Sequence, residues 1–206
     1  MNSAFLFDLD GTLLDSKGDL ADAANAARSA MGLPPLSDAD VEQHTGWGLA
    51  ALLEGVLPKA DVAGLARARE VFVQYYRGHL AVRSRAYPGV EAMFEVMRGR
   101  RLGLVTNKPA MFTEPLLEKL GWHTRFETVV CGDTLPHRKP SPEPLLHAIR
   151  ALGVEPRDCV FVGDTPIDRD TAANAGVRFV SVAWGRAAAD AVECITDLAT
   201  LPLRFP

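Results

Sequence analysis

Two aspartates follow the first apolar stretch of the chain. In FLFDLDGTLLDS, residues 5–16, Asp8 and Asp10 stand two positions apart, directly before a Gly-Thr turn. Like charges this close repel each other, so structure alone gives a poor reason for the pair, although strand-end turn formation is an alternative for the two residues by themselves. A bound cation would offset the repulsion.

The segments around this pair predict a parallel sheet covered by helices on both faces. Short apolar runs rich in β-branched and aromatic residues recur along the chain, and most are followed by a turn and a helical pattern. The runs are AFLF, RLGLVT, FETVVCG, CVFVG and VRFVSVAW, and helical patterns include VEAMFEVM and EPLLHAIRAL. This alternation indicates an α/β fold, a Rossmann-like doubly wound parallel sheet.

Residues 16–86 have a different pattern, with no convincing strand. Apolar residues recur at helical spacing in three stretches, Leu20 to Met31, Leu49 to Leu57 and Leu65 to Leu80. Proline- and glycine-containing breaks separate them, with Ser37 or Asp61 available to cap the next helix. We expect an all-helical cap at 16–86, inserted into a catalytic core of residues 1–15 and 87–206, with the hinge at the two crossings.

Polar residues follow four of the predicted strands. Ligands of an open parallel sheet bind beyond the carboxyl ends of its strands, so these groups are expected at one rim. Carboxylates converging there with a hydroxyl and a lysine would form a site for a hard cation such as Mg²⁺ beside a site for an anion. The groups are Asp8, Asp10, Gly11 and Thr12; Thr106, Asn107 and Lys108; Gly132, Asp133 and Lys139; and Gly163, Asp164, Thr165 and Asp168.

These residues resemble the haloacid dehalogenase superfamily, specifically its phosphatases with a small helical cap and most closely the phosphoglycolate phosphatase-like branch. DLDGTLLDS matches the first motif, VTNKP the second, RKPSPEP the third and VGDTPIDRDTAANAG the fourth, in the right order along the whole chain. The resemblance implies that Asp8 is the nucleophile, that Asp10 is the general acid and base, and that Thr106 and Lys139 bind the phosphoryl group. It further implies Asp164 and Asp168 as Mg²⁺ ligands, and we place Asp8 and Asp10 in the same metal site.

The chemistry of these residue types supports the implied roles. An ionised aspartate can attack phosphorus once a cation lowers the electrostatic barrier. A carboxyl two residues along an extended segment lies on the same face, so Asp10 can protonate the leaving oxygen and then deprotonate the attacking water. Lys139 and the Thr106 hydroxyl would face the equatorial oxygens, where charge accumulates in the transition state.

Several of these residues have a plainer alternative. Thr106 could be an ordinary strand-end hydroxyl, Lys139 a solvated loop lysine, and Asp168 only a charge favoured by a helix N-terminus. Asn107 and Trp47 are further substrate-binding candidates; Trp47 lies in the glycine-flanked turn HTGWGL, where a packing role is equally open. The cap residues that select the leaving group are not determined by the sequence, and the candidates are Thr45, Trp47, Arg77, Arg83 and Arg85.

Composition limits the other classes of function. The net charge of −4 argues against a nucleic-acid binder, and no apolar run approaches a membrane span or forms a signal peptide, so we expect a cytoplasmic protein. Cys131, Cys159 and Cys194 lack metal-type spacing and suit reduced, buried thiols. The five histidines form no ligand spacing. We expect a monomer or homodimer whose partner is a small phosphorylated metabolite.

The predicted function is a Mg²⁺-dependent phosphomonoester hydrolase that works through an aspartyl phosphate, with phosphoglycolate the best single substrate by resemblance. A closing cap would favour small soluble substrates. A dehalogenase would need neither the metal nor Asp10, and a phosphonate hydrolase would need a cap lysine, where only Lys17 and Lys59 are present. A sugar phosphomutase is harder to exclude. A catalytically silent sensor of a phosphorylated metabolite is the alternative from another class.

Overall fold

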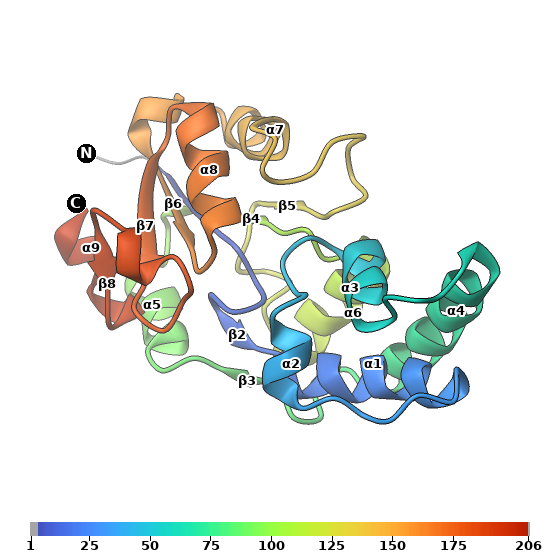
Figure 1. Ribbon diagram of the computed structural model, residues 1–206. Coiled ribbons are helices and arrows are strands. Elements are labelled where there is room, and N and C mark those ends of the chain that lie inside the picture. The colour runs from blue at the N-terminus through green and yellow to red at the C-terminus, as the bar shows by residue number, and fades with distance from the viewer. Residues whose placement is uncertain (1–3, 206) are drawn as a thin grey trace.

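A six-stranded parallel sheet forms the centre of the structure, a computed structural model that describes residues 4–205 (Figure 1). Its strand order is β5-β4-β1-β6-β7-β8. The chain moves from β1 outward through β4 to β5, and then returns to the other side of β1 at β6, so the order reverses beside β1. The strands are β1 (Ala4–Phe7), β4 (Arg101–Val105), β5 (Thr128–Val130), β6 (Cys159–Gly163), β7 (Arg178–Val182) and β8 (Cys194–Ile195).

Helices cover both faces of this sheet, as the alternation of side chains in β1 requires. Phe5 and Phe7 belong to one buried cluster with residues of α5 and α6, whereas Ala4 and Leu6 belong to a second cluster with residues of α7 and α8. The predicted doubly wound α/β core is therefore confirmed. These helices are α5 (Val90–Val96), α6 (Ala110–Leu120), α7 (Glu143–Leu152) and α8 (Pro166–Ala175).

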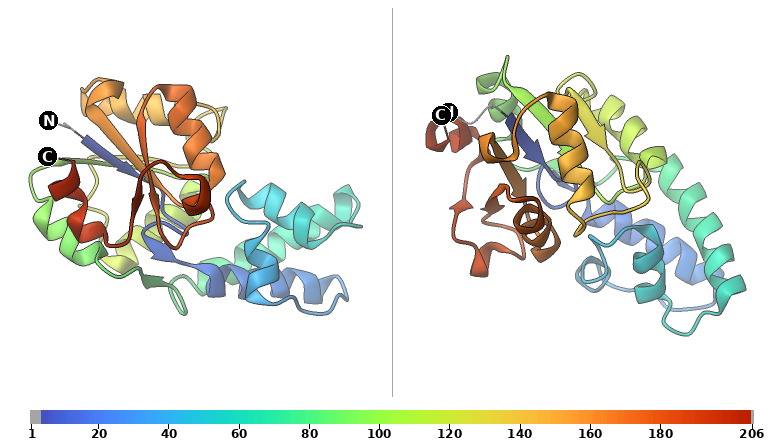
Figure 2. Two further views of the ribbon diagram at one scale, coloured as in Figure 1. Left: turned by 60° about the vertical axis from the view of Figure 1, so that its left-hand side comes forward. Right: turned by 90° about the horizontal axis from the view of Figure 1, so that it is seen from above.

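The described residues between the two crossings are helical and lie to one side of the core (Figure 2). We call α1–α4 the cap helices: α1 (Lys17–Ala30), α2 (Asp38–Glu42), α3 (Leu49–Val56) and α4 (Val62–Gly78). An antiparallel pair of two-residue strands joins them to the core, with Leu14 opposite Ala86 and Asp15 opposite Arg85. These strands are β2 (Leu14–Asp15) and β3 (Arg85–Ala86). The division at residues 16–86 stays a prediction, and residues 1–3 and 206 of the expected core lie outside the described residues.

Local sequence explains where the cap helices begin and end. Ser37 caps α2 in a capping box with Asp40, and the Asp61 carboxylate accepts a 2.8 Å hydrogen bond from the Gly64 N–H at the start of α4. The third predicted helix was expected to include Leu80, but α4 ends at Gly78, a residue that disfavours helix. Leu80 is nevertheless buried beyond that end.

Most of the elements that the sequence did not predict are very short strands and helical turns. The two-residue strands and β8 are too short to show a period, so the sequence did not reveal them. Cys131 and Cys159 are buried as expected, whereas Cys194 is partly exposed because it begins the edge strand β8. The remaining helical turns are η1 (Pro156–Asp158), η2 (Ala188–Asp190), η3 (Leu198–Thr200) and α9 (Leu201–Arg204).

Within residues 4–205, none of the helices combines the length and the apolar character that a membrane span needs.

Candidate active site

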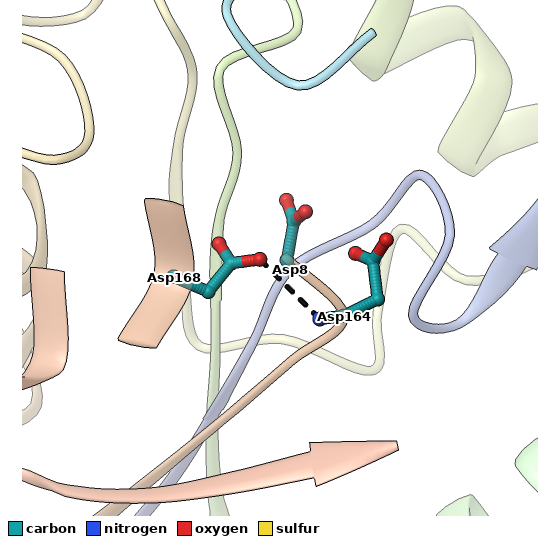
Figure 3. Close-up of side chains that lie close together, drawn as sticks. All are labelled: Asp8, Asp164 and Asp168. Carbon is teal, nitrogen blue, oxygen red and sulfur yellow. Dashed lines mark hydrogen bonds between the residues drawn. The ribbon is translucent and has the colours of Figure 1, made fainter. Parts of the chain in front are cut away.

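Three buried aspartates converge beside the point where the strand order reverses (Figure 3). Asp8 directly follows β1, Asp164 directly follows β6, and Asp168 lies in the first turn of α8. One carboxylate oxygen of each lies within 4.8 Å of the other two. Their exposed fractions are 7%, 7% and 0%, so three mutually repelling groups are held away from water. Such a cluster requires compensating positive charge.

Asp164 is held in this cluster by the turn that follows Asp8. The Thr12 hydroxyl donates a 2.9 Å hydrogen bond to Asp164 Oδ1. Gly11 adopts a φ of +88°, and a Cβ atom there would lie 2.7 Å from Asp164 Cγ. Only glycine both tolerates this conformation and leaves room for the carboxylate. The Gly-Thr turn that follows the two aspartates therefore positions a third carboxylate from the far end of the sequence.

Asp168 accepts hydrogen bonds both from the start of α8 and from Lys139. Its Oδ2 accepts hydrogen bonds from the Thr165 N–H at 3.0 Å and the Thr165 hydroxyl at 2.7 Å, in a capping box. Its Oδ1 accepts a 2.6 Å hydrogen bond from Lys139 Nζ. The structure thus places Asp168 both at the helix start and within the acidic cluster.

Lys139 supplies the positive charge of the cluster. It is 2% exposed, and its Nζ lies 2.9 Å from Asp8 Oδ1 as well as bonding Asp168. Burial alone would lower the pKa of Lys139, but Asp168 and Asp8 raise it above its usual range, so the side chain is cationic at neutral pH. Lys139 is therefore not a solvated loop lysine.

Asp8 combines burial with an oxygen left open to a ligand. Burial raises the pKa of its carboxyl to about 7; Lys139 opposes this rise and Asp168 adds to it. The contact with Lys139 lacks hydrogen-bond angles, and no other donor in residues 4–205 bonds Asp8 Oδ1. A buried carboxylate oxygen without a hydrogen bond is costly, which is typical of a group that faces a bound cation or substrate.

Asp10 lies apart from the three-carboxylate cluster, on the side of the cap helices. Lys108 Nζ lies 3.1 Å and 3.0 Å from its two oxygens, and the Ser16 hydroxyl donates to its Oδ1 at 2.6 Å. Lys108 also donates a 2.7 Å hydrogen bond to the hydroxyl of Tyr76, on cap helix α4. A chain of polar contacts therefore runs from Asp10 through Lys108 into the cap helices.

Thr106 and Asn107 follow β4 and have different surroundings. The Thr106 oxygen accepts a 3.2 Å hydrogen bond from the Lys108 N–H, which leaves its hydroxyl hydrogen to donate. The Asn107 amide NH₂ donates to the Gly46 carbonyl at 2.9 Å and to the Lys139 carbonyl at 3.0 Å, and its oxygen accepts from the Lys139 N–H at 3.0 Å. Asn107 thus holds protein groups in place around the lysine.

The end of α2 and the loop that follows it are held over the site through their backbone carbonyls. Arg186 donates to the Glu42 carbonyl at 3.3 Å and the Thr45 carbonyl at 3.1 Å, and Arg138 donates to the Trp47 carbonyl at 3.4 Å. The Trp47 residue is 51% exposed and does not line the cavity below. The structure therefore brings the backbone of this turn close to the site but not the indole.

A cavity of about 60 Å³ separates the acidic groups from the cap helices. Of the candidates for selecting the leaving group, Thr45 lines it, whereas Arg77, Arg83 and Arg85 are exposed. Arg83 instead bonds Asp22 and Asp38 on the outside of the cap helices. The lining residues are Asp8, Asp10, Leu20, Thr45, Gly46, Gly48, Leu49, Leu52, Phe72, Tyr76, Thr106, Asn107, Lys108, Pro109 and Phe112.

Sequence reasoning placed Lys108 at the rim, after Thr106 and Asn107, but gave it no role, and it missed Tyr76 as a residue of this lining. The sequence did not identify Tyr76 as a site residue, because it occupies an apolar position in the helical periodicity of α4, which is typical of a core residue.

The cluster fits a divalent cation. Carboxylate oxygens are the ligands of Mg²⁺, and Asp8 offers one buried oxygen without a hydrogen bond. Asp164 and Asp8 each carry a pKa raised by burial, and mutual repulsion with Asp168 raises both further, which a cation would relieve. Asp168 has both oxygens in hydrogen bonds, and Asp10 faces Lys108, so Asp8 and Asp164 are the best-placed ligands.

Comparison with protein families gives a match over residues 5–182 to the model described as haloacid dehalogenase-like hydrolase. The chain belongs to this family. The matched region contains Asp8, Thr106, Lys139 and Asp164, so the resemblance drawn from the four motifs is confirmed at the level of the family.

Relatives of this hydrolase cover most of its length. It is 43% identical over 191 residues to a phosphoglycolate phosphatase of Chromobacterium violaceum, covering 89% of this chain and 86% of the relative. It is 36% identical over 185 residues to an N-acetylmuramic acid 6-phosphate phosphatase of Pseudomonas aeruginosa, covering 88% and 82%. A crystal structure of a predicted phosphoglycolate phosphatase from Haemophilus somnus superposes with a TM-score of 0.93 at 29% identity, covering 99% and 98%.

Proposed function

We propose that this hydrolase is a Mg²⁺-dependent phosphomonoesterase for a small phosphorylated metabolite, and that phosphoglycolate is its substrate. The observation that carries the proposal is Asp8, a buried carboxylate with an oxygen free of hydrogen bonds, beside Lys139 and facing the cavity. The phosphatase names of relatives such as that of C. violaceum support both the reaction and the substrate.

Asp8 is the nucleophile in this proposal. A carboxylate oxygen attacks phosphorus, the P–O bond to the alcohol breaks, and an aspartyl phosphate results. Lys139 and the free hydroxyl hydrogen of Thr106 are the donors for the equatorial oxygens, where charge accumulates as the phosphoryl group is transferred. Both residues come from loops at the same rim, so neither needs to move far.

Asp10 is the general acid and general base in this proposal. It lies two residues beyond the nucleophile and lines the cavity on the side of the cap helices, where the leaving alcohol must be. As general acid it protonates the departing oxygen, and as general base it then takes a proton from the water that hydrolyses the aspartyl phosphate. To do so its carboxyl must turn from Lys108 toward the ester oxygen.

Mg²⁺ would be held by Asp8 and Asp164, with Asp168 next to them, and when bound it supplies the positive charge that lets an anionic carboxylate approach an anionic phosphate. Thr12 then keeps Asp164 oriented, and Asp168 keeps Lys139 oriented. The sequence analysis placed Asp10 in the metal site; in this proposal Asp10 transfers the proton instead, because its side chain faces Lys108.

The names of the relatives favour hydrolysis of a small ester over sugar phosphate isomerisation, since relatives that cover most of this chain are phosphatases. The free thiols of the three cysteines support the further expectation of a reducing, cytoplasmic environment. The proposal keeps the expectation of a monomer or homodimer.

A screen of small phosphorylated metabolites tests the proposal. Purified protein is assayed with each ester in Mg²⁺ and in EDTA, and the esters are ranked by kcat/KM. We expect phosphoglycolate to rank first, EDTA to abolish turnover and Mg²⁺ to restore it. Asp164→Asn should raise the Mg²⁺ concentration needed for half-maximal activity or abolish turnover. Full activity in metal-free buffer would contradict the metal requirement, and inactivity toward every ester would contradict the reaction.

A further inference from the structure

The cavity has a strongly asymmetric lining. On the side of the leaving alcohol its walls are mostly apolar: Leu20, Leu49, Leu52, Phe72, Pro109 and Phe112. Among the described lining residues, Lys108 is the only one with a cationic side chain, since Lys139 is not part of the lining. A leaving group in this cavity therefore meets hydrocarbon on most sides and one ammonium group.

Lys108 is buried and presents its charge at the edge of this space. It is 6% exposed, and its Nζ contacts Asp10 and the Tyr76 hydroxyl. An ammonium group away from water needs an anionic partner. Asp10 is that partner in the structure, but Asp10 must turn to the ester oxygen during the proposed reaction. An anion on the substrate would then be needed to pair with Lys108.

Tyr76 adds a second donor at the same position. Its oxygen accepts from Lys108, and within residues 4–205 its own O–H hydrogen has no acceptor among the hydrogen bonds formed. Burial raises the pKa of Tyr76 to about 12, so the hydroxyl keeps its hydrogen at neutral pH. The rings of Phe72 and Phe112, with centroids 5.6 Å and 5.0 Å from that of Tyr76, fix its orientation.

We propose that Lys108 and Tyr76 bind a carboxylate carried by the leaving alcohol, and so select phosphate esters of short hydroxy acids over esters of neutral alcohols. The inference rests on the proposed phosphatase activity and assigns its specificity to two residues. A carboxylate one methylene group from the ester oxygen is close enough to reach Lys108 while Asp10 contacts that oxygen, since Lys108 and Asp10 are already 3.0 Å apart. A longer or bulkier acid would meet the apolar wall.

The test compares two esters that differ only in the charged group. For 2-phosphoglycolate and ethyl phosphate, kcat/KM is measured at saturating Mg²⁺ in the wild type, Lys108→Met, Lys108→Arg and Tyr76→Phe. Loss of a charge-assisted contact predicts that Lys108→Met lowers kcat/KM for phosphoglycolate about 10- to 100-fold more than for ethyl phosphate. Tyr76→Phe should lower the same ratio by about 2- to 10-fold. Lys108→Arg should retain part of the preference.

The control is Lys59→Met, which removes an exposed lysine of the cap helices and should leave the ratio unchanged. A binding measurement separates recognition from turnover: in an Asp8→Asn background, Lys108→Met should weaken calorimetric binding of phosphoglycolate more than that of inorganic phosphate.

Equal loss for both esters in Lys108→Met would overturn the inference, because Lys108 would then act only through Asp10. A wild type that hydrolyses ethyl phosphate as well as phosphoglycolate would also overturn it while leaving the phosphatase activity intact. Inactivity of the wild type toward every phosphate ester would instead overturn the proposed function.

Discussion

The two sides of the cavity are built from different kinds of groups. The core side holds four buried charged residues, at strand ends, in the first turn of α8 and in the loop between β5 and α7, namely Asp8, Asp164, Asp168 and Lys139. The cap side offers apolar side chains and backbone carbonyls, and reaches the charged groups through the contact of Tyr76 with Lys108. We therefore propose that the reaction takes place on the sheet side and that the cap helices select the molecules that reach it.

The difference follows from how each side is held. β1 is hydrogen-bonded to β4 and β6 in a fixed register, so the residue after each strand has a defined position. The cap helices are joined to the core by two short strands, and Asp19 of α1 holds the segment before β3, because its carboxylate accepts hydrogen bonds from the N–H groups of Arg83 and Ser84 at 2.7 Å and 2.9 Å. The fixed register of the sheet is suited to holding catalytic groups in place, whereas the short connections of the cap helices are suited to opening for substrate entry.

The largest expected effect comes from the core side. Asp8→Asn should lower turnover by about 10⁴-fold or more, because an amide is a poor nucleophile. The covalent phosphoenzyme should disappear with it, as measured by intact mass after rapid quenching. If turnover stops while a phosphorylated species still forms, the nucleophile is another residue.

Asp10→Asn should slow turnover by about 10² to 10⁴-fold. The loss in the first step should be large for an alkyl phosphate, whose alkoxide must be protonated, and smaller for an aryl phosphate that departs unaided. Burst kinetics with both esters measure this difference. Phosphoenzyme should accumulate in the variant if hydrolysis of the intermediate becomes slow. Equal burst losses for the two esters would contradict the role of Asp10 as general acid.

Asp19→Asn tests the hydrogen bonds between α1 and the segment before β3 and should lower the free energy of unfolding by about 1 to 3 kcal/mol, since the new NH₂ group cannot accept the N–H hydrogen bonds that the replaced oxygen accepts. Burial alone would raise the pKa of Asp19, but hydrogen bonds from Ser84 and neighbouring backbone N–H groups lower it. Because the pKa of Asp19 is lower in the folded than in the unfolded protein, its ionised carboxylate stabilises the fold at pH values above the unfolded pKa of about 3.9. This stabilisation is lost as the pH falls through the folded pKa.

The stability difference between wild type and Asp19→Asn should therefore be constant from pH 7 to 5 and shrink below about pH 4, as measured by urea unfolding. Asp22→Asn is the matched control on the same helix, because its partly exposed ion pair with Arg83 should contribute less than about 1 kcal/mol. A difference that grows toward low pH would have the wrong sign for this explanation.

The smallest effect is expected for Trp47→Ala. The indole is half exposed and outside the cavity, so kcat/KM should change by less than about threefold and the ranking of phosphate esters should stay the same. Thr45→Ala, which alters a residue that lines the cavity, provides the comparison. A changed ranking in Trp47→Ala would show that the indole reaches the substrate when the cap closes.

Much of the fold and of the core side could be predicted because the signals are local. Runs such as CVFVG are apolar on both faces, which identifies them as central strands, and polar residues at their ends must meet at one rim. The cap side was less predictable. Leu20, Phe72 and Tyr76 share the same helical periodicity, and no feature of the sequence distinguishes a residue facing a cavity from one facing a core.

The sequence by itself determined the α/β core, the helical insertion and the set of groups that could handle phosphate, since each depends on residue type and on spacing along the chain. Only the tertiary structure decided how those groups pair. It set Asp168 against Lys139 and Asp10 against Lys108, turned Trp47 outward, and brought Tyr76 from α4 to Lys108 beyond β4. The physical reason is that these contacts depend on distances between side chains that are far apart in sequence. Those distances are set only when the helices pack on the sheet.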